Sequence, residues 1–168
     1  KFINDNPNYM DVMKENGFQV KHSVKYNTYL IKNHYDNPLP YDEEKPWKMS
    51  CKSVIVDSLT NQIICISPSK STKIDVCDFS VSSVQQIVDG TMINLFYHND
   101  EWLVSSRSEI GGNNRNYKRP TFKKLFDECS TNLDHDTLDK NHMYSFVMRH
   151  VSNRIVTPVH ENMIVLVD

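Results

Sequence analysis

The sequence has few cysteines, no long apolar run and no secretion signals. The four cysteines show no Cys-x-x-Cys pair and no zinc-finger spacing, and a chain of this size needs no disulfide framework. We therefore expect reduced, mostly buried thiols at Cys51, Cys65, Cys77 and Cys129. No apolar run approaches the roughly 20 residues of a membrane span, and no Asn-x-Ser/Thr acceptor occurs. These absences predict an intracellular protein, cytoplasmic or nuclear, that does not contact a membrane.

The sequence also lacks an excess of positive charge. The formal net charge is -2 over 168 residues, so no global positive field attracts the chain to nucleic acid, and any such binding must be local. The length fits one domain spanning residues 1–168. The abundance of Asn, Lys and Ile is typical of an A+T-rich genome, such as that of a large DNA virus or a protist, so a viral origin is one of two sources that fit.

The most informative stretch covers residues 84–112. Its pattern predicts a strand, a tight turn at Asp89-Gly90 and a second strand over residues 91–97. A second reversal at residues 98–100 leads into a strand over 101–106. A polar loop over 109–116 is then expected.

The rest of the chain predicts an α+β domain with an antiparallel core, in which about eight short strands accompany two helices. Asn6 and Pro7 are expected to begin the first helix and Gly17 to end it. Apolar spacing predicts a second, amphipathic helix from Thr121 to about Asn132. The further strands are expected over residues 18–24, 28–32, 51–57, 62–67, 144–149 and 162–167. Continuous apolar runs predict that the hairpin 51–57/62–67 is buried on both faces of both strands.

Three motifs carry a resemblance to a known family. They are Ile87-Val88-Asp89-Gly90-Thr91, Ser105-Ser106-Arg107, and FVMRHVSNRIV over residues 146–156. In order and spacing the chain resembles, over roughly residues 28–168, the adenylation domain of ATP-dependent RNA ligases of the bacteriophage T4 kind. That family belongs with DNA ligases and capping enzymes in the nucleotidyltransferase superfamily. The resemblance implies a partial antiparallel-sheet nucleotidyltransferase core, similar to an ATP-grasp-like ligase adenylation core, with ATP and Mg²⁺ as the family's ligands.

The catalytic residues of that family are replaced in this chain. The family's Lys-x-Asp-Gly lysine attacks the α-phosphate of ATP, and here Ile87 takes its place. A hydrocarbon side chain has no lone pair for nucleophilic catalysis. Val147 stands at a family glutamate, and Lys52-Ser53 stands at an Arg-Gly pair. The family's later Glu-Gly and Lys-x-Lys motifs find no counterpart. We therefore expect no catalytic residue, with Ile87 at the nucleophile position.

Two groups of residues are candidates for ligand binding. The resemblance implies nucleotide contacts at Asp89, Gly90, Arg107 and Lys70. A basic segment with one aromatic side chain could bind RNA by phosphate contacts and base stacking; its members are Arg115, Tyr117, Lys118, Arg119, Lys123 and Lys124. For Asp89-Gly90 the alternative is a hairpin turn with no role in catalysis or binding. For the basic segment the alternative is a solvent-exposed helix face whose positive charges are balanced by nearby acidic residues. No metal-ligand spacing and no catalytic triad is present.

Three functions fit these observations. The first is a degenerate RNA-ligase-like domain, a pseudoenzyme that binds nucleotide or RNA. The second is a structural or interaction module of a larger, viral assembly, which would bind a protein partner. The third is an ATP-dependent RNA ligase whose nucleophilic lysine has been mutated to Ile87.

Overall fold

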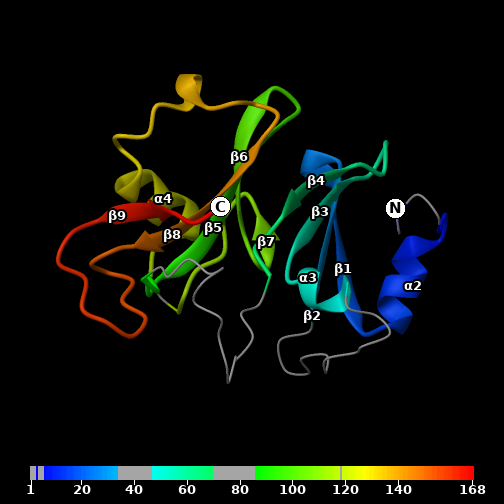
Figure 1. Ribbon diagram of the computed structural model, residues 1–168, viewed down its shortest axis with the longest axis horizontal. Helices are drawn as coiled ribbons and strands as arrows, with labels where there is room; N and C mark the ends of the chain where they lie inside the picture. The colour runs from blue at the N-terminus through cyan, green and yellow to red at the C-terminus, as the bar shows by residue number, and fades with distance from the viewer. Residues whose placement is uncertain (1–2, 4–5, 34–46, 70–85, 118) are drawn as a thin grey trace, which may run out of the picture.

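The chain forms an α+β fold with two antiparallel sheets (Figure 1). The structure is a computed structural model that describes residues 3, 6–33, 47–69, 86–117 and 119–168. The first sheet has the strand order β1-β2-β3-β4. Its strands are β1 (Phe18–Ser23), β2 (Thr28–Asn33), β3 (Val54–Asp57) and β4 (Ile63–Ile66).

The second sheet is formed by the C-terminal half of the chain. Its strand order is β7-β6-β5-β8-β9, so the two central strands come from segments far apart in the sequence. Its strands are β5 (Thr91–His98), β6 (Glu101–Ser106), β7 (Glu109–Ile110), β8 (Met143–Arg149) and β9 (Met163–Leu166). The register pairs Thr91 with Met148 and Phe96 with Met143 across β5 and β8.

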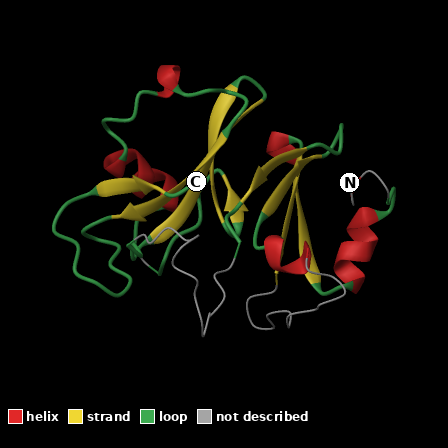
Figure 2. Cartoon of the chain, in the orientation of Figure 1, coloured by secondary structure: helices red, strands yellow, loops and turns green. Residues whose placement is uncertain are grey.

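The helices lie on the outer sides of the two sheets, as Figure 2 shows. Helix α2 (Tyr9–Glu15) covers the first sheet and α4 (Phe122–Cys129) covers the second. Thr121 caps α4, because its side chain accepts a hydrogen bond from the backbone N–H of Lys124. The short elements are α3 (Trp47–Ser50), η1 (Val24–Tyr26) and η2 (His135–Thr137). The order of layers is therefore α2, first sheet, second sheet, α4.

An apolar cluster joins the two sheets. It contains side chains from η1, from both sheets and from the strand β7, all buried. Its members are Tyr26, Leu30, Ile55, Cys65, Phe96, Leu103 and Ile110. Since alternate residues of a strand point to opposite faces, this cluster identifies which residues of each strand face the other sheet.

Most of the predicted elements are confirmed. The reversal between β5 and β6 has left-handed backbone at Asn99 (φ 50) and Asp100 (φ 62), as a two-residue hairpin loop requires. The amphipathic helix is confirmed but ends at Cys129. The three cysteines in the described part of the chain are buried and unpaired, while Cys77 lies outside it.

Four expectations were wrong. Residues 86–89 form no strand, so Asp89-Gly90 is not a tight hairpin turn. The expected loop over 109–116 contains β7, which adds an edge to the second sheet. β3 is buried, but Ile63 and Ile66 of β4 are 49% and 40% exposed, because β4 is an edge strand. The helix expected to begin at Asn6 and Pro7 is α2, which begins at Tyr9 after an Asn8 cap that makes no side-chain hydrogen bond.

No helix of the described segments is long and apolar enough to span a bilayer.

Candidate functional site

Part of the space between the sheets is polar. Seven polar side chains occupy strand positions that face the opposite sheet or lie just beyond a strand end, and none is more than 6% exposed. One is Thr28, at the start of β2. The other six form the inter-sheet polar seam, which consists of Lys32, Ser53, Ser67, Asn94, Ser105 and Ser145. Buried polar groups are costly unless they are hydrogen-bonded, so the contacts of the seam decide what it can do.

Asn94 connects the two sheets within the seam. Its Nδ2 donates to Ser67 Oγ at 2.7 Å, and Ser145 Oγ donates to Asn94 Oδ1 at 2.9 Å. The hydroxyls of Ser53 and Ser105, by contrast, have no hydrogen-bond partner among the described residues. The seam therefore contains a hydrogen-bonded part around Asn94 and two buried hydroxyls, those of Ser53 and Ser105, without a partner among the described residues.

Lys32 is the charged member of the seam. It is 6% exposed, and its Nζ donates to Ser108 Oγ at 3.1 Å. Burial, followed by the nearby charges of Lys21 and Arg107, lowers the pKa of Lys32 below its ordinary value. Within the described segments no carboxylate forms an ion pair with it. A buried cation among other cations is unfavourable without an anion.

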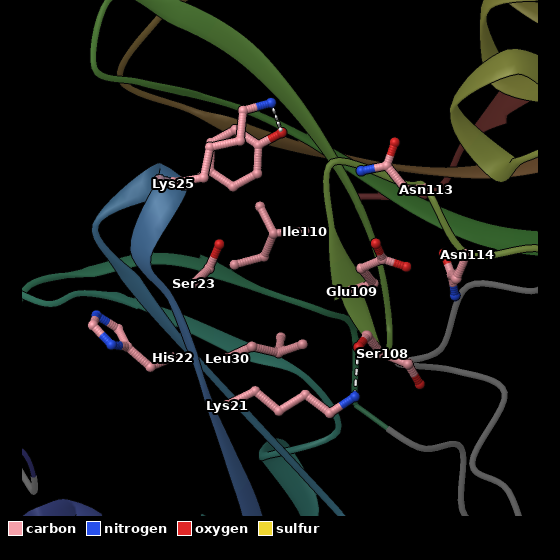
Figure 3. A pocket seen from close by; sticks show the side chains of 11 residues that line it. Lys21, His22, Ser23, Lys25, Leu30, Ser108, Glu109, Ile110, Asn113 and Asn114 are labelled. Atoms are coloured by element: carbon pink, nitrogen blue, oxygen red, sulfur yellow. Dashed lines mark hydrogen bonds between the residues drawn. The ribbon is translucent and has the colours of Figure 1, made fainter.

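A pocket of about 430 Å³ opens beside Ser108, at the edges of the sheets formed by β1 and β7. Figure 3 shows Lys21, His22 and Lys25 on one wall, with Ser108, Glu109 and Asn113 on the other. Lys21 Nζ donates to the carbonyl oxygen of Ser108 at 3.4 Å, so both Lys21 and the buried Lys32 contact the same residue.

A second pocket, of about 300 Å³, contains Ile87. Ile87 itself is 93% exposed, and Val147 of β8 lines the same pocket. The pocket is lined by Gln86, Ile87, Val88, Met92, Val147, Val165, Leu166 and Val167. None of these described side chains is ionisable, so they can enclose an apolar group but offer no nucleophile, acid or base.

Asp89 has a structural role in the loop between β8 and β9. Its Oδ2 accepts hydrogen bonds from the backbone N–H groups of Val156 (3.0 Å) and Thr157 (2.8 Å) and from the Thr157 hydroxyl (3.0 Å). The two backbone hydrogen bonds, first from Thr157 and then from Val156, hold the pKa of Asp89 below its ordinary value. Asp89 therefore connects the segment before β5 to a loop 67 residues later.

Replacing Asp89 by alanine is expected to release this loop without unfolding the sheets. The pKa of Asp89 is lowered by folding, so its stabilising contribution is present above the unfolded value of about 3.9 and is lost as pH falls through the folded value. The protection of the Val156 and Thr157 amides against hydrogen exchange, relative to the intrinsic exchange rate at the same pH, should therefore fall in the variant, and in the native protein on acidification. Asp134→Ala, which removes a different turn contact, should leave both amides protected. Unchanged exchange in Asp89→Ala would contradict this role.

Gly90 is required by a close approach of two strands. A Cβ at this position would lie 2.5 Å from the carbonyl oxygen of Met148 and 2.7 Å from Val147 Cγ1. Residue 90 therefore packs against β8 with no room for a side chain. The glycine is explained by sterics and not by the hairpin turn expected from the sequence.

The other expected ligand contacts fall into three groups. Arg107 is half-buried near Lys32, whereas Lys70 and Lys118 lie outside the described residues. Arg115 and Tyr117 are exposed, and Tyr117 is 95% accessible.

The remaining three basic residues of the RNA-binding prediction have intramolecular partners. Arg119 Nη1 donates to Asn153 Oδ1 at 3.1 Å. Lys123 Nζ lies 2.6 Å from Asp127 Oδ1, and Lys124 Nζ lies 3.9 Å from Glu128 Oε1. The two lysines fit the alternative of a solvated helix face, because each is offset by an acid one turn away.

Sequence patterns missed the seam. Asn94 lies between the core residues Ile93 and Leu95 of β5, and a polar residue in such a position is the signal that could have found it. Lys32 carries no such signal, because Asn33 follows it in β2. No group of three or more His, Cys, Asp or Glu residues in the described ranges is arranged to hold a metal ion.

No protein-family model matches the chain, and no curated protein matches it.

Proposed function

We propose that the chain is an RNA-ligase-like nucleotidyltransferase domain that has lost covalent catalysis and binds a nucleotide in the Ile87 pocket. One observation supports this most. Ile87 and Val147 are 60 residues apart, occupy the positions of the family's lysine and glutamate, and line one pocket. If the resemblance holds, Ile87 and Val147 must lie close together in the fold. Their separation in the sequence does not by itself bring them together.

The chemistry of the pocket supports a binding function over a transferase function. The side chains of Ile87 and Val147 cannot attack a phosphate, bind a metal or move a proton. The carboxylate of Asp89 is engaged by the loop that contains Val156 and Thr157. What remains is an apolar surface suited to a nucleobase or ribose, beside the polar seam.

Binding of ATP, measured by isothermal titration calorimetry, tests the proposal. Ile87→Glu places a negative charge beside the bound phosphates and should weaken binding about tenfold, since charge repulsion near a protein surface amounts to a few kcal/mol or less. Leu59→Glu is the matched control, because Leu59 is also exposed (78%) but lies in the β3–β4 turn. ATP binding that is absent, or equally weakened by both variants, would refute a nucleotide pocket at Ile87.

Labelled ATP separates the pseudoenzyme from a mutated ligase. The proposal predicts that Ile87→Lys forms no covalent adenylate, because Val147 still replaces the glutamate and the Arg-Gly pair is also absent. A labelled Ile87→Lys protein would instead favour the ligase whose lysine has been mutated.

RNA binding is part of the same proposal, with Arg115 and Tyr117 as its best-supported contacts because both are exposed. A salt-dependent gel shift that weakens in Tyr117→Ala would support it. An RNA that fails to shift at low salt would favour the interaction module.

A further inference from the structure

A phosphate group is the ligand chemistry that best fits the cations around Ser108. Lys32 extends from the middle of the first sheet into the space between the sheets, where water is scarce. Its ammonium has three donor hydrogens, and among the described residues it donates only to Ser108 Oγ. Lys21, on the neighbouring strand β1, reaches the carbonyl oxygen of the same Ser108. Two lysines therefore converge on one residue of the β6–β7 connection.

The energetics of this arrangement are unfavourable without an anion. Burying an unpaired charge costs several kcal/mol, and a second cation nearby adds repulsion. The lowered pKa of Lys32 reports both effects. An oxyanion beside Ser108 would accept hydrogen bonds from both ammonium groups, and the Ser108 hydroxyl could donate a third. Charge-assisted bonds of this type are among the strongest in proteins.

We propose that Lys32, Lys21 and Ser108 bind a phosphate group where Ser108 lines the β1–β7 pocket, as inorganic phosphate or as the terminal phosphate of a small ligand. Lys21 and Ser108 line this pocket, and Lys32 lies behind Ser108, to which its ammonium donates. The pocket volume of about 430 Å³ exceeds that of a phosphate ion and leaves space for an attached group. Lys25 lies in the same pocket, with its Nζ 3.0 Å from the Tyr26 hydroxyl. Glu109 also lines it, and its carboxylate would repel an anion placed at the outer end.

This site is separate from the nucleotide pocket of the proposed function. The two pockets share no lining residue, and β6 and β5 lie between β7 and β8 in the second sheet. Phosphate binding at Lys32 stands if no nucleotide binds at Ile87. Adenosine, which carries no phosphate, reports on the Ile87 pocket alone.

The test measures thermal stability and binding with inorganic phosphate, and with methyl phosphate as the ester form, against chloride at equal ionic strength. A ligand that binds only the folded state raises the melting temperature. Both phosphates should raise it in the native protein. Binding of inorganic phosphate alone would assign the site to the free ion. Binding of methyl phosphate as well would assign it to the terminal phosphate of a small ligand.

Three lysine variants test which residues bind the phosphate. Lys32→Met keeps the length of the side chain and removes the buried charge, so it should fold with equal or higher stability in chloride and lose the phosphate-dependent rise. Lys21→Met, at an exposed position, should weaken binding about tenfold, which corresponds to one charge-assisted hydrogen bond. Lys140→Met is the matched control, because its ammonium lies over the Tyr97 ring, and it should keep the full rise. No rise in the native protein, or an equal rise in all three variants, would overturn the proposal.

Discussion

Replacing Asn94 by alanine is expected to lower the free energy of unfolding by about 2–4 kcal/mol, because each buried group left without its partner costs about 1–3 kcal/mol. Asn94 is 1% exposed. Its amide supplies the hydrogen bond between the second sheet and Ser67, which follows β4. Its carbonyl oxygen accepts from Ser145 of β8. Alanine removes both partners at once and leaves two buried hydroxyls unsatisfied. Chemical denaturation followed by circular dichroism measures the effect.

Two further variants test the cause of this loss. Asn132→Ala removes an exposed asparagine that follows α4 and should change stability by less than about 0.5 kcal/mol. The combination of Asn94→Leu, Ser67→Ala and Ser145→Ala replaces every member of the network by apolar groups. It should recover most of the lost stability, since no polar side-chain atom of this network is then left without its partner. If the triple variant were less stable than Asn94→Ala, volume and not hydrogen bonding would explain the role of Asn94.

Gly90→Ala is expected to destabilise the protein by about 1–3 kcal/mol, the usual range for an overpacked site. The added Cβ would meet the carbonyl oxygen of Met148 at 2.5 Å, and a backbone atom cannot move aside as a side chain does. At an unstrained position the same change would stabilise slightly, by reducing the entropy of the unfolded chain. Since Gly90 is not among the glycines with positive φ, the sign of the change distinguishes a steric requirement at residue 90 from the absence of one. Thermal and chemical denaturation both measure it.

Val147→Ala provides the comparison for Gly90→Ala. It removes Val147 Cγ1, which the new Cβ would meet at 2.7 Å, but leaves the Met148 carbonyl in place. In the double variant we expect only part of the Gly90→Ala effect to be relieved. Full relief would show that the side chain, and not the backbone of β8, excludes a residue larger than glycine.

Several elements could be predicted because they depend on neighbouring residues. The hairpin between β5 and β6 needs two residues that accept a left-handed backbone, and Asn99 and Asp100 provide them. The α4 helix needs a cap and an apolar stripe, and Thr121 with Phe122 and Leu125 provides both. Such local determinants are visible in any short window of sequence.

Asp89-Gly90 shows the limit of that reasoning. A local pattern predicted a hairpin turn, but Asp89 binds the amides of Val156 and Thr157 and Gly90 packs against Met148. Those partners lie more than 50 residues away. Long-range contacts therefore explain why position 89 is an aspartate and position 90 a glycine.

By itself the sequence determined the class of fold, most of the strands and the fourth-layer helix α4, since each depends on propensity and apolar periodicity over a few residues. It also placed aliphatic side chains at Ile87 and Val147, which supply neither a nucleophile nor an acid. The tertiary structure alone decided that these two residues share a pocket, that Asn94 joins the sheets and that Lys32 is buried beside Ser108. The physical reason is that burial and pairing are set by which strands become neighbours, and sheet order is not encoded in the periodicity of any single strand.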